Sequence, residues 1–425
     1  MLIYFRFKNY KCFKDEATLF MEATRLKNLK ESNTFEIDKI SLLKSAVIYG
    51  PNASGKSSVI DALKKMKDIV LHSLDFGISK NYNAEPFLLN IKTQSEVSLF
   101  EVAIIVDNVK YRYGFEINID STIKKEWLYQ KKLQYKSREI NLFKREDSNI
   151  ILGASFKEGK ALIEKTRDNA LFLTVVAQFN GEISNKILEW FKELNILSNL
   201  KSDDFEHFSF EMLKNDTLKE KIVTIIKEAD VGIYDIINKK ITYEELKKDN
   251  KNIDKLPDFI IDEIKEKGID TIETKHIVYD EEGNFFGLKN FDLSMESDGT
   301  KKLLALVGPL LYTLFNGKVL VIDELDNSLH TSLVRAIVKL FNSNKFNKLG
   351  AQIIFTTHDT NLLDQELFRR DQIYFTQKDI YGASELYSLV EYGKGKARDD
   401  LALEKNYLKG KFGATPHINF SLLDE

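Results

Sequence analysis

The chain has 425 residues, of which 43% are hydrophobic and 30% charged. This is enough for two or three packed lobes, and it excludes an intrinsically disordered or collagen-like protein. Lys and Arg number 62 and Asp and Glu 65, so the formal net charge of −3 gives no global electrostatic reason to bind nucleic acid. The single cysteine, Cys12, excludes an intrachain disulfide and is typical of a reducing compartment.

No segment of the sequence has the length and apolarity of a membrane anchor. The first fifteen residues carry Arg6, Lys8, Lys11 and Lys14 among apolar residues, which is unlike a signal peptide. The apolar run 303–315 contains Pro309 and is shorter than the roughly 20 residues that a membrane span needs. We therefore expect a cytoplasmic protein without a membrane partner.

The N-terminal part of the chain predicts strands around one helix. Residues 2–7 and 45–49 have the apolar character of strands, and the second strand leads directly into a glycine loop. Residues 55–74 have helical spacing of their apolar positions. Polar and apolar residues then alternate between 97 and 151, which predicts antiparallel hairpins, one of them turning at Asp107-Asn108.

The middle of the chain predicts an inserted helical region. Residues 182–267 are charged and helical in character, but the heptads do not persist, which excludes long coiled-coil arms. A β pattern returns from 274 and is followed by a helix at 300–314. Buried strands of the parallel-sheet type are expected at 319–322 and 352–355.

The first and last segments of the chain therefore belong to one α/β layer, with other material inserted between them. We expect four parts: an N-terminal part at 1–180 with the glycine loop and the antiparallel strands, a helical insertion at 181–273, a second α/β part at 274–395, and a tail at 396–425.

The glycine loop matches the phosphate-binding pattern G-x-x-x-x-G-K-[ST], between an apolar strand and an amphipathic helix. Its backbone N–H groups and the helix N-terminus would hold the phosphates of a nucleotide. Lys56 would reach the β and γ phosphates, and the Ser57 hydroxyl would be a ligand of Mg²⁺. The residues of this predicted site are Gly50, Pro51, Asn52, Ala53, Ser54, Gly55, Lys56, Ser57 and Ser58.

Two carboxylates follow the strand expected at 319–322. Asp323 would hold Mg²⁺ through water, and Glu324 would polarise the water that attacks the γ phosphate. His358 follows the other buried strand, where it can donate a hydrogen bond to the γ phosphate. Each of these residues could instead have a structural role. The two carboxylates could be an ordinary polar strand end, and the histidine could be a polar residue whose hydrogen bonds are satisfied. The phosphate loop in the same chain favours the functional interpretation.

These motifs resemble the ABC-type ATPases of the SMC/RecF/OLD branch. The resemblance implies an α/β fold, that of an ABC-type P-loop ATPase head with an antiparallel β subdomain. It also implies ATP as the nucleotide and Mg²⁺ as cofactor. Segment 7–15 is similar to the branch's opening hairpin, in which a basic residue at the position of Lys11 lies near the nucleotide. Segment 325–330 resembles the D-loop, with Asp326, and His358 the switch histidine.

The segment LSMESDGT, at 293–300, stands where the ABC signature is expected. Ser297 and Gly299 match the serine and the second glycine of the signature, whereas Asp298 replaces its first glycine. A helix N-cap at Ser297 or Asp298 is compatible with this interpretation, because ABC signatures also open helices.

The last 150 residues, with segments such as ESDGTKKLLAL and VIDELDNSLH, are also similar to the RloA/AbiL-type ATPases of bacterial abortive-infection operons. The resemblance implies a head-to-tail homodimer, or a higher oligomer, closed by ATP between two copies. Only 67 residues follow His358, which is too few for the nuclease domain of OLD proteins, so we expect a separate effector, for which a nuclease is the leading candidate. The alternative is a RecF-like ATPase that binds DNA ends.

Four features of the sequence stay open. Gln178 is the candidate for the glutamine loop that senses Mg²⁺, against an ordinary polar residue at an element boundary. The group 369–371 is either a surface salt-bridge cluster or part of signalling. The lysines at 239–240 and 247–248 predict a solvated face or a nucleic-acid contact, and the segment 405–412 either docks a partner or closes the lobe.

Overall fold

The computed structural model of the protein describes residues 1–75, 84–133, 137–198, 208–210, 212–229, 232–249, 256–391 and 402–415. The chain divides into two compact units, each built from discontinuous segments. The P-loop unit comprises 1–199, 313–327 and 334–425, and the signature unit comprises 200–312 and 328–333. In the described ranges, no helix is both long and apolar enough to cross a membrane.

A six-stranded sheet carries the sequence motifs of the P-loop unit. Its strands, in spatial order, are β11 (Asn195–Leu197), β15 (Val319–Ile322), β16 (Gln352–Thr356), β5 (Ser45–Tyr49), β17 (Ile373–Lys378) and β18 (Ser384–Ser388). All neighbours pair in parallel except the edge strand β18. The strands β5, β15 and β16 are completely buried, as their continuous apolar sequences predict. Both ends of the chain thus meet in one α/β layer, as expected.

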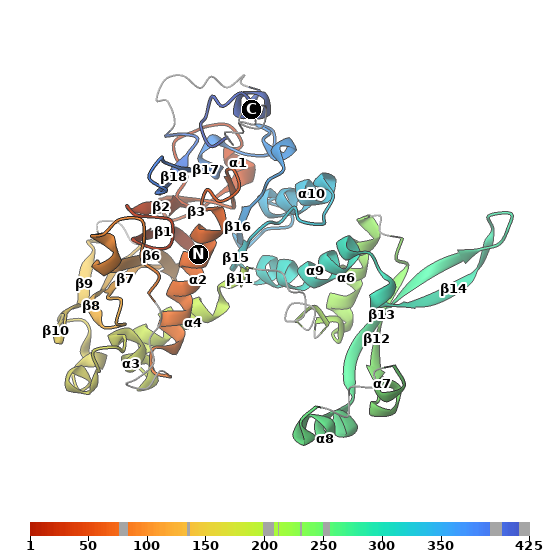
Figure 1. Cartoon of the computed structure of the whole chain (residues 1–425), viewed down its shortest axis with the longest axis horizontal. Coiled ribbons are helices and arrows are strands. Elements are labelled where there is room, and N and C mark those ends of the chain that lie inside the picture. Colours follow the sequence, from red (N-terminus) through yellow and green to blue (C-terminus); the bar gives the residue numbers. More distant parts are fainter. Residues whose placement is uncertain are drawn as a thin grey trace, which may run out of the picture. The chain divides into compact units, whose positions relative to one another are not determined.

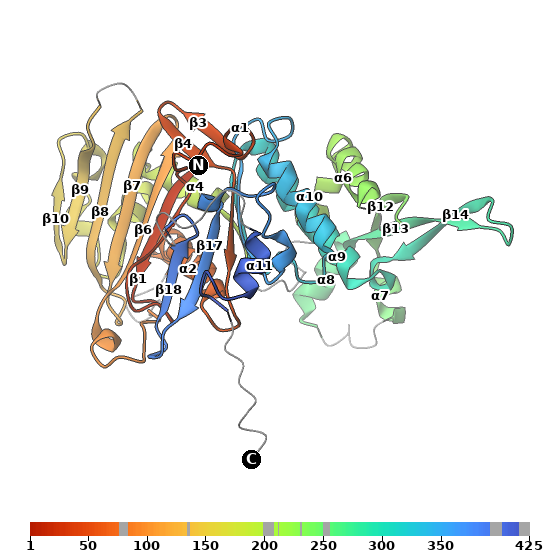
Figure 2. The same ribbon diagram turned by 90° about the horizontal axis from the view of Figure 1, so that it is seen from above.

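A seven-stranded antiparallel sheet forms a second layer of the same unit (Figure 2). Its strands, in spatial order, are β10 (Asn149–Leu152), β9 (Ile140–Glu146), β8 (Ile123–Lys132), β7 (Val109–Ile117), β6 (Ser98–Val106), β1 (Leu2–Lys8) and β2 (Ala17–Phe20). The turn between β6 and β7 is made by Asp107 and Asn108, both with positive φ, as tight hairpins require. The predicted hairpins are confirmed, and with them the antiparallel β subdomain.

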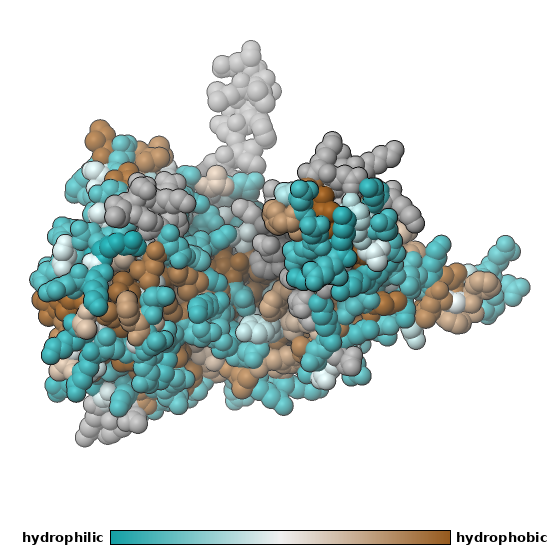
Figure 3. Space-filling view, turned by 90° about the horizontal axis from the view of Figure 1, so that it is seen from below, coloured by the Kyte–Doolittle hydropathy of each residue, from teal (hydrophilic) through white to brown (hydrophobic). Residues whose placement is uncertain are grey.

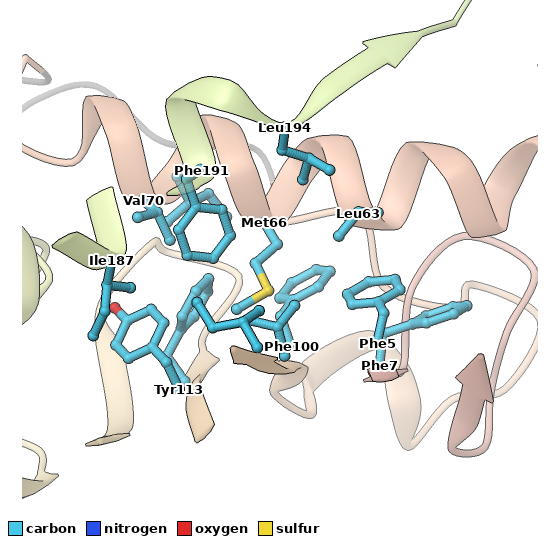
Figure 4. Packing of buried hydrophobic residues seen from close by; sticks show 14 of the residues in the cluster. Phe5, Phe7, Leu63, Met66, Val70, Phe100, Tyr113, Ile187, Phe191 and Leu194 are labelled. Carbon is cyan, nitrogen blue, oxygen red and sulfur yellow. The ribbon is translucent and has the colours of Figure 1, made fainter. Parts of the chain in front are cut away.

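Helices pack between these layers and form the main core. The helix α2 (Lys56–His72) turns Leu63, Met66 and Val70 towards aromatic side chains of the antiparallel sheet, and α4 (Glu182–Glu193) adds Ile187 and Phe191 (Figure 4). The short helix α3 (Phe172–Gln178) is buried beside them. The unit also contains α1 (Lys30–Asn33), β3 (Thr34–Ile37), β4 (Ile40–Leu43) and α11 (Leu403–Leu408). This packing fixes the start of α2, and therefore the phosphate loop, against the sheet.

The signature unit has a core of its own around a three-stranded antiparallel sheet (Figure 1). The strands are β12 (Asp235–Ile241), β13 (Ile269–Tyr279) and β14 (Phe285–Asp292). The helices are α6 (Asp216–Glu228), α7 (Tyr243–Asp249), α8 (Asp258–Lys267) and the long α9 (Asp298–Asn316), which runs into the P-loop unit at 313. The helix α10 (Thr331–Asn342) likewise begins in the signature unit and continues into the P-loop unit.

The unit boundaries differ from those expected from the sequence. The helix α4 lies inside the expected insertion at 181–273, yet it belongs to the P-loop unit because its apolar face joins the main core. The insertion also contains the strand β12, in which Ile236 is fully buried. The charged residues and the helical spacing of this stretch predicted helices, so the strand was not predicted from the sequence.

Two of the open polar features are resolved as structural elements. Arg369 is fully buried rather than exposed, and it donates to both carboxylate oxygens of Asp371 and to the carbonyls of Thr24, Leu26 and Asn28. It therefore ties two distant parts of the chain together. At the C-terminal end, Tyr407 stacks on Phe375 at 5.3 Å between ring centroids, so the segment 402–415 closes the lobe.

Candidate active site

The phosphate loop is shaped by close contacts at the carboxyl end of the parallel sheet. Gly55 has φ of 109°, and a Cβ at this position would lie 2.9 Å from the Cys12 sulfur. Ser54 is hydrogen-bonded through its hydroxyl to the Thr376 hydroxyl of the adjacent β17 at 2.6 Å. The loop thus leads into the N-terminus of α2, whose free N–H groups form an anion site.

Lys56 is buried in this loop, with 5% of its surface exposed. Its ammonium group donates to the carbonyl oxygens of Gly50 and Pro51, at 2.8 and 3.1 Å. Burial lowers the pKa of Lys56 to about 8, although the carboxylates of Asp323, Glu324 and Asp326 act in the opposite direction. A buried ammonium held only by carbonyls gains a strong partner when a phosphate enters the loop.

The carboxylates after β15 are organised by a residue that sequence reasoning missed. Thr356, fully buried at the end of β16, donates its hydroxyl to Asp323 at 2.6 Å. The same oxygen accepts the backbone N–H of Glu324 at 2.7 Å. Glu324 has a left-handed backbone with φ of 51°, a conformation that costs free energy and occurs often at functional sites. A threonine after a buried apolar strand was the only signal for this role in the sequence.

His358 lies beside the catalytic candidate Glu324. Its Nε2 is 3.9 Å from Glu324 Oε1, and both side chains are nearly half exposed. The backbone N–H of His358 donates to the Asp326 carboxylate at 3.1 Å, so Asp326 holds the histidine segment within the P-loop unit. The remaining Asp326 oxygen, Oδ1, is buried without a hydrogen-bond partner.

These residues surround a pocket of about 510 Å³. Its lining consists of Lys11, Cys12, Asn52, Ala53, Ser54, Gly55, Lys56, Ser57, Ser58, Glu324, His358 and Lys378. The volume is in the range of ligand sites in proteins. The structure therefore gathers the predicted phosphate loop, catalytic carboxylate and histidine at one place.

Two predicted oxygen donors could serve a metal ion here: Ser57, which lines the pocket, and Asp323, which follows β15 and does not line it. Ser57 offers a hydroxyl, and Asp323 is oriented by Thr356. Among the described residues, no group of three or more His, Cys, Asp or Glu side chains could hold a metal ion. Mg²⁺ takes few protein oxygens and keeps several waters, so this sparse donor set is compatible with it.

A second pocket of about 620 Å³ shares Lys11, Cys12 and Lys378 with the first. Its other lining residues include Leu88, Leu89 and Ile119, and it is mainly apolar. A flat nucleobase suits such a surface, whereas phosphates suit the first pocket. Lys378, at the end of β17, borders both pockets and was not predicted from the sequence.

Two residues predicted to belong to the nucleotide site have other surroundings in the structure. Lys11 lines the pocket, but its ammonium pairs with Asp61 at 2.7 Å and with Glu85 at 3.7 Å. Gln178 is exposed at the end of α3 and does not line the pocket. The helix α3 is bonded through Thr174 to the carbonyl of Val70, near the far end of α2, so the structure does not bring Gln178 to the predicted metal site.

Ser297 and Gly299, the residues matched to the signature, belong to the signature unit. Ser297 is exposed, and its hydroxyl oxygen accepts the backbone N–H of Thr300 at 3.1 Å. The serine thus caps the first turn of α9, as its place before the helix predicts. The structure therefore contains the helix cap, and the signature role of the same residue stays a prediction.

The chain is similar to proteins of known family. Residues 45–364 match the family described as "AAA domain, putative AbiEii toxin, Type IV TA system". The "Retron Vc95 probable ATPase" of Vibrio cholerae serotype O1 biovar El Tor is 22% identical over 380 residues, 80% of this chain and 71% of the relative. An "ATP/GTP phosphatase" of Helicobacter pylori (strain ATCC 700392 / 26695) is 24% identical over 378 residues, 84% and 91% of the two chains.

Among solved structures, the chain is similar to an SMC head crystallised with the C-winged helix domain of ScpA. The sequence identity is 13% and the TM-score 0.44, over 91% of this chain and 97% of that one.

Proposed function

Because the chain belongs to the family described as an AAA domain and putative AbiEii toxin of type IV toxin–antitoxin systems, we propose that it is an ATP-driven switch in bacterial antiphage or abortive-infection defence. The chain is an ATPase of this type and binds a nucleotide. The observation that carries the proposal is the convergence of Lys56, Glu324 and His358 on one pocket.

We propose a role for each residue during hydrolysis of ATP. Lys56 and the N-terminus of α2 hold the triphosphate, and Ser57 and Asp323 would hold Mg²⁺, which neutralises phosphate charge. Glu324, positioned by its N–H bond to Thr356, orients the attacking water and accepts its proton. His358 donates to the oxygen that becomes more negative as the γ phosphate leaves.

We propose that a second copy completes this site with its Ser297, so that ATP closes a head-to-tail dimer. Two observations support it: Glu324 and His358 are half exposed, and Ser297 is exposed at a helix N-terminus. An exposed catalytic pair is poorly shielded from water, and a partner surface would exclude that water. Hydrolysis would then reopen the dimer and act as a timer.

The nucleotide assignment is tested by turnover with ATP and GTP, with and without Mg²⁺. The wild-type protein is expected to hydrolyse ATP in the presence of Mg²⁺ only. Glu324→Gln should bind ATP with unchanged affinity and lose turnover by about 10²–10³-fold, the cost of removing one catalytic group. Turnover that survives in Glu324→Gln would show that another group activates the water.

We further propose that the switch controls a separate effector, with a nuclease as the leading candidate. The support is the family's description as a toxin–antitoxin system and the similarity to a retron ATPase. Affinity purification of the tagged chain with the product of its neighbouring gene, in ATP, ADP and apo conditions, tests this. Co-purification that depends on the nucleotide is expected, and failure in all three conditions would contradict the proposal.

Binding to DNA ends remains the alternative function. A described lysine of the candidate basic patch, Lys239, is paired with Glu273 at 2.7 Å, which does not favour a phosphate contact. A mobility-shift assay across salt concentrations separates the two functions, because a DNA-binding ATPase would show ATP-dependent affinity that falls steeply with salt. We expect no specific shift.

A further inference from the structure

The signature loop, residues 293–300, is anchored to β13 by the carboxylate of Glu296. Glu296 directly precedes Ser297 and has only 7% of its side chain exposed. Its Oε1 accepts a hydrogen bond from the Thr274 hydroxyl and lies 2.7 Å from His276 Nε2. A buried carboxylate is tolerated where donors satisfy it, and here both donors come from β13.

The signature loop is closely packed on its other side as well. A Cβ on Gly299 would lie 2.6 Å from the backbone oxygen of Ser328, which belongs to the same unit. The backbone N–H of Glu296 donates to the carbonyl of Leu293, and Ser297 caps α9. The position of the Ser297 hydroxyl therefore depends on a few polar contacts rather than on burial of the serine itself.

His276, which contacts Glu296, lies at the point where the three-stranded sheet continues with two strands only. The strand β12 pairs with β13 from Ile241 to Asp235, whose partner is Lys275. From His276 onward, only β13 and β14 pair among the residues that the structure describes. The His276 ring is stacked on Phe291 of β14, with 4.4 Å between centroids and 27° between planes. His276 is thus fixed to both strands of the hairpin at its root.

The hairpin beyond this root is exposed from 279 to 286. Tyr279, Phe285 and Phe286 are 59%, 66% and 76% exposed. Apolar and polar residues lie side by side at this end of the signature unit (Figure 3). Two strands without further packing are only marginally stable, so a small displacement of the hairpin costs little free energy. Because His276 lies at the root of the hairpin, such a displacement would move its side chain.

We propose that Glu296, Thr274 and His276 form a latch that positions the signature serine and couples it to the β13–β14 hairpin. Glu296 is a positioning residue: it touches neither nucleotide nor the reacting atoms and acts through Ser297. The inference rests on the proposed function, in which Ser297 completes the ATP site of a second copy. Displacing the hairpin would release Glu296 and slow turnover without changing how the P-loop unit binds ATP.

The latch is tested by steady-state turnover together with the affinity for a fluorescent ATP analogue. Glu296→Ala and His276→Ala are expected to lower kcat roughly 10- to 100-fold, as misplacement of a site group by about 1 Å does, while the affinity changes less than about twofold. Glu296→Gln keeps an acceptor oxygen and should recover most of the turnover. Lys289→Ala, the cross-strand neighbour of His276, is the matched control and should leave kcat unchanged.

The contact between Glu296 and His276 is tested further by combining the two substitutions in one variant. If Glu296 and His276 act through one contact, the double variant Glu296→Ala/His276→Ala should be no slower than the slower single variant. Additive losses, or equal losses of kcat and of nucleotide affinity, would contradict the latch.

Amide hydrogen exchange on the nucleotide-free protein separates this inference from the proposed function. Glu296→Ala and His276→Ala should accelerate exchange at 293–304 at least threefold, with no change at 50–60 in the P-loop unit. If the wild type hydrolyses no ATP, this exchange result still decides whether the latch exists. If the wild type hydrolyses ATP and the variants match it in both turnover and exchange, the latch is wrong and the proposed function stands.

Discussion

The two units of this protein present their site residues in different physical settings. In the P-loop unit, Ser54, Lys56 and Thr356 are 2%, 5% and 0% exposed and are held by neighbouring strands. In the signature unit, Ser297 and Asp298 are exposed. Their positions depend on the helix cap at Ser297 and on the latch formed by Glu296, Thr274 and His276.

The difference indicates what each unit can do by itself. A phosphate site that is built into a packed sheet is preorganised, so one copy is sufficient for nucleotide binding. An exposed serine at a helix start is inert until something is placed against it. Changes in the P-loop unit should therefore alter nucleotide affinity, and changes in the signature unit should alter turnover only.

The largest effect is expected from Lys56→Ala. Removing the buried ammonium that faces the phosphates should weaken ATP binding by at least about 100-fold, the scale of a lost charge-assisted contact at a buried site. Isothermal titration with a nonhydrolysable ATP analogue measures it. Wild-type affinity in this variant would mean that the triphosphate lies outside the loop.

A slightly smaller effect is expected from Ser297→Arg, which changes the signature unit. A long cation at this exposed position should block the approach of a second copy and lower turnover roughly 50-fold, with ATP affinity kept within about twofold. Ser294→Arg, three residues earlier and also exposed, is the control. A loss of affinity in Ser297→Arg would remove the distinction between the two units.

Thr356→Val tests how the P-loop unit holds its carboxylates. Valine keeps the shape but removes the hydroxyl that bonds Asp323 and Glu324, so turnover should fall about 20-fold, with a loss of stability of roughly 1–3 kcal/mol. Thr356→Ser keeps the hydroxyl and should retain most of the turnover. Equal turnover in the valine and serine variants would show that the bonds do not position the catalytic group.

The smallest predicted effect is the pH dependence of ATP affinity. The pKa of Lys56 is lowered to about 8 by burial, so the nucleotide-free protein loses this positive charge as pH rises through 8. The charged form binds the triphosphate, so the dissociation constant should rise about tenfold between pH 7 and pH 9. Lys56→Arg stays charged and should show little change over this range.

The local motifs of the P-loop unit were predictable because each is contiguous in sequence. The loop at 50–58, the carboxylates after β15 and the hairpins after 97 have patterns that depend only on neighbouring residues. The pocket that brings Glu324 and His358 together follows from the parallel order of β15, β16 and β5, since the carboxyl ends of parallel strands meet at one edge of the sheet.

Other features depend on contacts between distant residues and left little local signal. Thr356 bonds the Asp323 carboxylate 33 residues before it, and Arg369 reaches carbonyls more than 340 residues away. Gln178 ends an apolar segment, as expected, but Thr174 fixes that segment near the far end of α2. The latch of Glu296 likewise joins residues 20 and 22 positions apart through the pairing of β13 and β14.

The central claim is that ATP joins two copies, each contributing the site half that the other lacks. The most direct test is the mass in solution of Glu324→Gln with ATP and Mg²⁺, measured by light scattering after size exclusion. We predict a dimer of about 98 kDa, twice the 49.1 kDa chain, that is absent without ATP and absent in Glu324→Gln/Ser297→Arg. A single-chain mass with ATP bound, or a dimer that Ser297→Arg leaves intact, would contradict it.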